Sequence, residues 1–79
     1  MEDKRKILNS LFIRLNWDAQ DTGMIRMRNE KMGGELQIRC TSLWKELINA
    51  IEPTEDFINR LTEFHNDVEK AAKETGLYK

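Results

Sequence analysis

The sequence predicts an α+β fold: a single small domain over residues 1–79, with three helices and one β-hairpin in the order α-β-β-α-α. Apolar residues recur at helical spacing near both ends of the chain, which predicts helices there. The chain has one proline and four glycines, so long helices are permitted. In the middle, apolar and polar residues alternate around a Gly-Gly pair, which favours a hairpin. A chain of this length forms one domain with a modest core.

The first helix is expected over about residues 3–20. Asp3 suits its N-terminus, where the helix dipole favours a negative group, and Gly23 suits its end. One apolar stripe, suited to face the core, is formed by Ile7, Leu8, Leu11, Phe12 and Leu15.

A second apolar pair lies on the opposite side of this helix. Ile13 and Trp17 are four positions apart and would contact each other. One interpretation is that the hairpin covers this side of the helix. The other is that the pair is an exposed anchor for a partner or for a second subunit, since tryptophan is frequent at binding hot spots.

The hairpin is expected over about residues 24–40, with strands at about 24–28 and 35–40 and the turn in NEKMGG. Its inner face would carry Ile25, Met27, Leu36, Ile38 and Cys40, and its outer face Arg26, Arg28, Glu35, Gln37 and Arg39. Two strands alone are marginally stable in water. The hairpin must therefore pack on the helices or pair with another copy.

Two helices are expected after the hairpin, over about residues 42–51 and 55–75. Thr41 or Ser42 can cap the first, and Pro53 should end it near Ile51. Thr54 can cap the second. The second helix has a long apolar stripe, formed by Phe57, Ile58, Leu61, Phe64, Val68, Ala71 and Ala72, and a Schellman-like end at Gly76 and Leu77.

The chain shows no signature of a catalytic or metal centre. His65 is the only histidine and Cys40 the only cysteine, too few ligands for a zinc site. We expect a packed or edge histidine, a buried thiol, no cofactor and no enzymatic activity. One cysteine cannot form an internal disulfide, which favours the cytoplasm. No segment has the apolar length of a membrane span, and the N-terminus is not expected to be a signal peptide.

A strand followed by two helices resembles the order of the ribbon-helix-helix repressors. The resemblance covers about residues 35–70, beginning with ELQIRCTSLWKEL. It implies that strands of two subunits pair and enter the DNA major groove, with outward side chains reading the bases. Gln37 and Arg39, with Arg28, would then contact nucleic acid. The Glu-Pro-Thr turn and the pI of about 5.8 depart from the family's pattern.

The function that these patterns favour is a small non-enzymatic protein-interaction module. It would inhibit or regulate a larger host protein, as small phage and mobile-element proteins do. The expected contact residues are Ile13, Trp17, Arg26 and Arg28. The alternative is a DNA-binding regulator of the ribbon-helix-helix type, and a homodimer is compatible with both functions.

Overall fold

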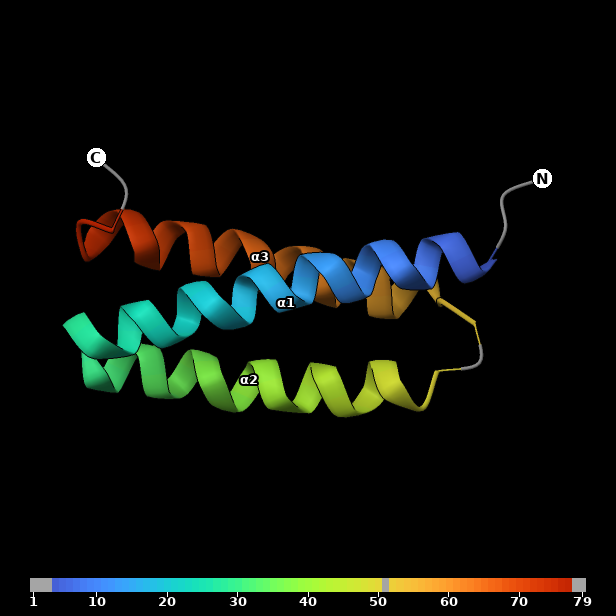
Figure 1. The fold of residues 1–79 in the computed structure, drawn as a ribbon, viewed down its shortest axis with the longest axis horizontal. Helices are drawn as coiled ribbons and strands as arrows, with labels where there is room; N and C mark the ends of the chain where they lie inside the picture. The colour runs from blue at the N-terminus through green and yellow to red at the C-terminus, as the bar shows by residue number, and fades with distance from the viewer. Residues whose placement is uncertain (1–3, 51, 78–79) are drawn as a thin grey trace.

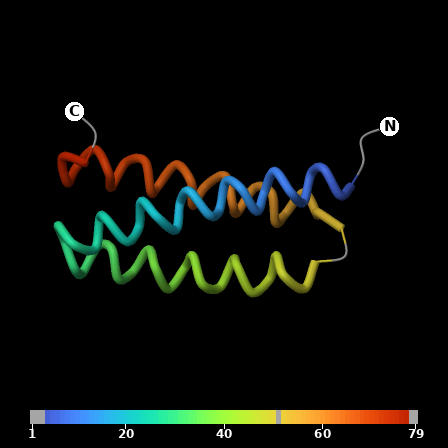
Figure 2. The backbone as a smooth tube through the Cα atoms, in the orientation of Figure 1, coloured from blue at the N-terminus to red at the C-terminus, as the bar shows by residue number. Residues whose placement is uncertain are grey.

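The computed structural model describes residues 4–50 and 52–77, which form three α-helices. They are α1 (Lys4–Arg28), α2 (Glu30–Ile48) and α3 (Glu55–Glu74). The helices lie side by side, with α2 antiparallel to α1 and α3 (Figures 1 and 2). No residue in the described ranges lies in a strand, so the predicted α+β class is wrong. The fold is an all-α helical bundle.

The segment predicted to be a hairpin, residues 24–40, is helical except at Asn29. Its residues suit a helix as well as a strand, because methionine and arginine are good helix formers. Leu36 and Cys40, two of the alternating apolar positions, are also one helical turn apart, and both are buried. Ile38 and Met27, assigned to the inner face, are 74% and 88% exposed. The alternation was therefore a poor guide to the buried positions.

Helix α1 continues to Arg28 instead of ending near residue 20. Its buried residues alternate at spacings of four and three: Leu11, Leu15, Asp18, Thr22 and Ile25. The buried face continues beyond Leu15, but two of its later positions, Asp18 and Thr22, are polar. The apolar pattern in the sequence therefore ended at Leu15. Gly23 lies inside the helix, and the predicted cap Asp3 lies outside the described residues.

A single residue, Asn29, joins α1 to α2. Its backbone N–H donates to the Ile25 carbonyl at 2.7 Å, and its side-chain oxygen accepts from the Met32 N–H at 3.1 Å. Asn29 therefore follows one helix directly and caps the next. Thr41, predicted to be a cap, lies within α2, where its hydroxyl donates to the Gln37 carbonyl at 2.9 Å.

The first turns of α2 lie against the last turns of α1 with no space for a side chain. A Cβ atom added at Gly33 would lie 2.3 Å from the Arg26 Cα. Only glycine allows this approach of two backbones. Gly34 differs from Gly33 in this respect, since a Cβ added at Gly34 would meet no atom within 4 Å. Gly33 thus serves helix packing, and both glycines lie within α2 and not in a turn.

Helix α3 has the predicted caps. The Thr54 hydroxyl oxygen accepts from the Phe57 N–H at 3.1 Å. At the other end Gly76 has a φ of +77°, and the Leu77 N–H donates to the Ala72 carbonyl at 2.8 Å. The Schellman-like end is confirmed. Helix α2 ends at Ile48, and Ile51, its predicted end, lies outside the described residues.

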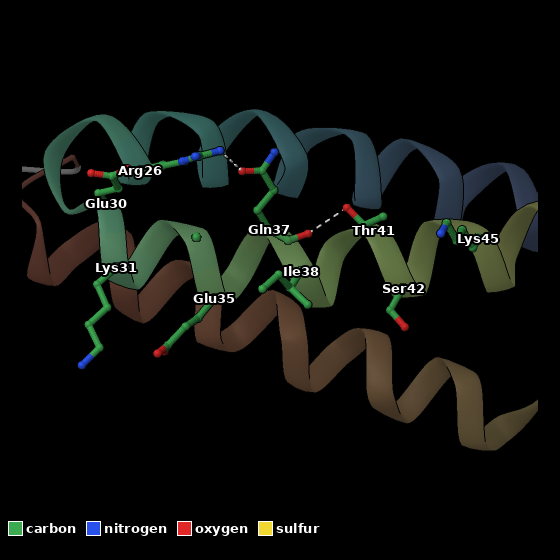
Figure 3. A pocket seen from close by; sticks show the side chains of 10 residues that line it. Arg26, Glu30, Lys31, Glu35, Gln37, Ile38, Thr41, Ser42 and Lys45 are labelled. Carbon is green, nitrogen blue, oxygen red and sulfur yellow. Dashed lines mark hydrogen bonds between the residues drawn. The ribbon is translucent and has the colours of Figure 1, made fainter.

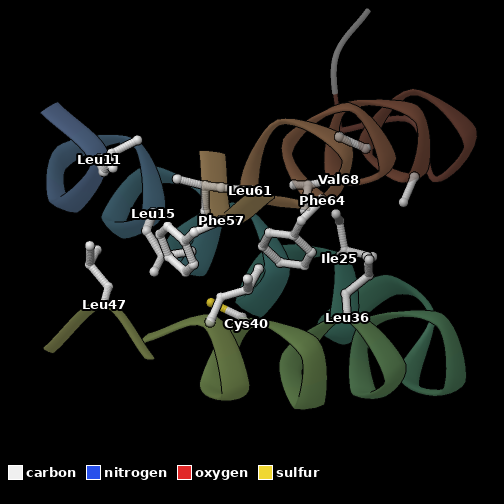
Figure 4. Close-up of a cluster of buried hydrophobic side chains, with 13 residues drawn as sticks. Leu11, Leu15, Ile25, Leu36, Cys40, Leu47, Phe57, Leu61, Phe64 and Val68 are labelled. Atoms are coloured by element: carbon white, nitrogen blue, oxygen red, sulfur yellow. The ribbon is translucent and has the colours of Figure 1, made fainter. Parts of the chain in front are cut away.

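The core lies between the three helices, each of which contributes one row of buried side chains (Figure 4). The buried residues of α2 are Gly33, Leu36, Cys40, Leu43 and Leu47. The buried residues of α3 are Phe57, Leu61, Phe64, Val68, Ala71 and Ala72. Spacings of four and three recur in both rows, as in coiled-coil packing.

The two glycines of α2 provide a matched test of this packing. Gly33→Ala should lower the free energy of unfolding by about 1–3 kcal/mol, because the new methyl group would overlap the backbone of α1. Gly34→Ala should raise it by up to about 1 kcal/mol, because alanine is the better helix former. Urea unfolding followed by circular dichroism measures both. Equal effects of the two substitutions would contradict the close contact.

Candidate protein-interaction surface

The side of α1 that faces away from the core carries a second row of residues. We call it the outer stripe, and it consists of Ile13, Trp17, Gln20, Met24 and Met27. Each follows a buried residue of α1 by two positions, which is a rotation of about 200° around the helix. The outer stripe therefore lies opposite the core and repeats the core's spacings of four and three.

The outer stripe is exposed and largely apolar. The exposed fraction is 61% for Ile13, 62% for Trp17 and 43% for Met24. Of the two interpretations of Ile13 and Trp17, the structure therefore supports an exposed pair. A helix in a small bundle needs only one apolar face. Contiguous apolar residues on a second face are typical of a surface that contacts another protein.

The arginines predicted to join this surface contact the other two helices. Arg26 Nη1 donates to Gln37 Oε1 on α2 at 2.6 Å. Arg28 Nη1 donates to the Thr75 carbonyl, at the end of α3, at 3.0 Å. The two arginines therefore border the outer stripe on different sides. Their contacts hold α1 to its neighbours.

The residues predicted to contact nucleic acid do not form one surface. Gln37 faces α1, whereas Arg39 turns toward α3, where its Nη1 lies 2.9 Å from Asp67 Oδ2. The Arg39 guanidinium also lies over the Phe64 ring, 5.2 Å from its centre. Arg28 lies at the far end of α1. The described chain has no ribbon of strands that could bring these three side chains together.

A shallow hollow of about 790 Å³ follows the outer side of α2. Figure 3 shows the hydrogen bond between Arg26 and Gln37 among the lining residues, while the side chains of Lys31 and Glu35 point away from that pair. Ile38 lies among these charged side chains. Binding sites for small molecules have a few polar groups that converge on the ligand. This hollow is open and its charges of both signs diverge, so the outer stripe is the stronger candidate.

A contact between a buried carboxyl group and a half-buried imidazole links α1 to α3. Asp18 is 1% exposed, and its Oδ1 lies 2.7 Å from His65 Nδ1. His65 Nε2 lies 3.3 Å from Glu69 Oε1 at the surface. Asp18 Oδ2 and the Thr22 hydroxyl oxygen, one turn later, are buried without a hydrogen-bond partner. The prediction of a packed or edge histidine fits the half-buried His65, whose partner Asp18 was not predicted.

Burial raises the pKa of two side chains in this part of the core, Asp18 and Cys40. Loss of solvent raises the pKa of Asp18 above its ordinary 3.8, and the hydrogen bond and charge of His65 only partly oppose it. The pKa of Cys40 is also raised, by burial first and by the Asp18 charge second, so its thiol is poorly nucleophilic. Within residues 4–50 and 52–77, no group of three acidic, histidine or cysteine side chains is placed to hold a metal ion.

The pKa of Asp18 leads to a prediction on stability. A carboxyl whose pKa is higher in the folded state stabilises the fold below its unfolded pKa, and this contribution is lost as the pH rises. The stability of the wild type relative to Asp18→Asn should therefore fall as the pH rises above 3.8 through the raised pKa. Urea unfolding across the acid to neutral range measures it. Glu63→Gln, at an exposed position of α3, controls for the loss of one carboxylate. A constant difference between wild type and Asp18→Asn would contradict the raised pKa.

None of the helices among the described residues has the length and apolar character to cross a membrane. Comparison with protein-family models, curated proteins and solved structures finds no match. The proposed function therefore rests on the properties of the outer stripe.

Proposed function

We propose that this chain is a non-enzymatic protein-interaction module that binds one amphipathic helix of a larger protein along the outer stripe of α1. Binding would inhibit or redirect that larger protein. The observation that supports the proposal is the second row of apolar side chains, repeated at coiled-coil spacing on the exposed side of α1.

The spacing of the outer stripe favours a helix as the occupant. Side chains at spacings of four and three fit as knobs into the holes of a facing helix. From Ile13 to Met27 the stripe extends about 21 Å, at 1.5 Å per residue, which is about four turns. A partner helix that docks by apolar residues one turn apart would match this length.

The composition of the outer stripe supplies both an anchor and adaptable contacts. Trp17 offers the largest side chain of the stripe, and tryptophan is enriched at binding hot spots. Met24 and Met27 are flexible and can adjust to the shape of a partner. Gly23, beside the stripe, has open space where a side chain would be, so a partner backbone can approach there.

The proposed partner is a larger host protein, as for small phage or mobile-element regulators. A bundle of 79 residues has a limited surface of its own. The outer stripe is a row of exposed residues that no described part of the chain covers.

Trp17→Ala tests the proposal. A photo-crosslinking residue at Met27 identifies the partner, and calorimetry with the purified partner then measures the dissociation constant. Truncation of a hot-spot tryptophan costs about 2 kcal/mol or more, so the dissociation constant should rise about 30-fold. Far-UV circular dichroism should not change, because Trp17 lies outside the core.

Ile38→Ala is the matched control, since Ile38 is an exposed apolar residue of α2. It should leave the dissociation constant unchanged. Equal binding by wild type and Trp17→Ala would refute the proposed surface, and so would equal weakening by both variants.

A further inference from the structure

We infer that the outer stripe of α1 also pairs, antiparallel, with the outer stripe of a second copy of this chain. In the pairing that we infer, Ile13 of each copy packs against Met24 of the other, and Arg14 of each copy lies beside Asp21 of the other. The self-pairing is argued from the side chains of α1 alone. Its consequence, that a second copy competes with the partner, rests on the proposed function.

The outer stripe is complementary to the outer stripe of a second copy that runs in the opposite direction. Its first half carries the bulky Ile13 and Trp17, and its second half carries the flexible Met24. An antiparallel partner places each half against the other, so rigid side chains meet an adaptable one. A parallel partner would instead place two Trp17 indoles in the same layer.

The charges beside the outer stripe favour the same direction. Arg14 and Asp21 each follow a stripe residue by one position, so both lie on the same edge of the stripe. In an antiparallel pair of helices this edge faces the same edge of the other copy. With Ile13 level with Met24, Arg14 lies about two residues, or about 3 Å, along the axis from Asp21 of the second copy. Two ion pairs form, one at each end of the interface.

A parallel arrangement forms neither ion pair. Each edge would then face the opposite edge of the other copy, which carries Asn16 and Gly23. Asp21 would meet Asn16, and Arg28 would meet Gly23. In the antiparallel arrangement Asn16 and Gly23 face each other instead. Both are small, and Gly23 has open space around it, so the two helices can approach closely on that side.

The inferred pairing has a regulatory consequence. The second copy and the larger partner would use the same side chains, including Trp17. Self-association would therefore cover the apolar surface until the partner is present, and partner binding would require the dimer to separate.

Charge exchange provides the test, with sedimentation equilibrium as the measurement. Arg14→Asp places two acidic groups beside each other at both ends of the interface, and Asp21→Arg places two basic groups there. Each variant alone should dimerise about five- to tenfold more weakly than the wild type, as expected for two exposed ion pairs replaced by repulsion. An equimolar mixture of the two variants should form a heterodimer with the wild-type affinity, because every pair is again of opposite charge.

A disulfide trap tests the register. Ile13→Cys with Met24→Cys, in a Cys40→Ala background, should give a covalent dimer in a glutathione buffer. Within one chain these two positions are 11 residues, or about 16 Å, apart along α1, too far for a disulfide. Ile38→Cys with Ile48→Cys, exposed on α2, is the matched control and should remain monomeric. Ile13→Cys alone would be trapped only in a parallel pair.

A wild-type chain that is monomeric at millimolar concentration would overturn the inference. So would a dimer that the mixed charge variants fail to restore, or a covalent dimer from Ile13→Cys alone. The proposed function is tested separately, by the affinity of the larger partner for Trp17→Ala. None of these results changes that affinity.

Discussion

The contact between Gly33 and the backbone of Arg26 is the constraint on which the rest of the structure depends. Asn29 alone joins α1 to α2, so the chain must reverse within one residue, and the two helices then lie too close for any side chain at Gly33. This close approach turns the buried rows of α1 and α2 toward a common side, where α3 packs. The opposite side of α1 is left exposed as a direct result.

The contact between the buried Asp18 and the half-buried His65 joins α3 to α1. A carboxylate buried in the core is costly unless a partner compensates it, and His65 supplies that partner at 2.7 Å. Because Asp18 Oδ2 and the Thr22 hydroxyl remain unpartnered, this part of the core is less stabilising than an apolar core would be.

The outer stripe connects the fold to the proposed function. The same helix carries two rows at the same spacing, one buried by α2 and α3 and one exposed. A surface built on a rigid helix holds Ile13, Trp17 and Met24 in fixed relative positions, which reduces the entropy lost on binding. The larger partner and a second copy would both use this preformed row, and they would therefore exclude each other.

The sequence by itself determined α3 almost completely, because Thr54, Pro53, Gly76 and the long apolar stripe act locally. It also indicated the pair of Ile13 and Trp17 as unusual. It could not separate helix from strand over residues 24–40, since Leu36 and Cys40 fit both periods and the polar Asp18 and Thr22 interrupted the row of α1. Asp18 could have been found only by extending the spacing from Leu15 to Ile25. The tertiary structure decided these points, because the approach of α2 to α1 at Gly33 and the partner of Asp18 on α3 are contacts between residues distant in sequence.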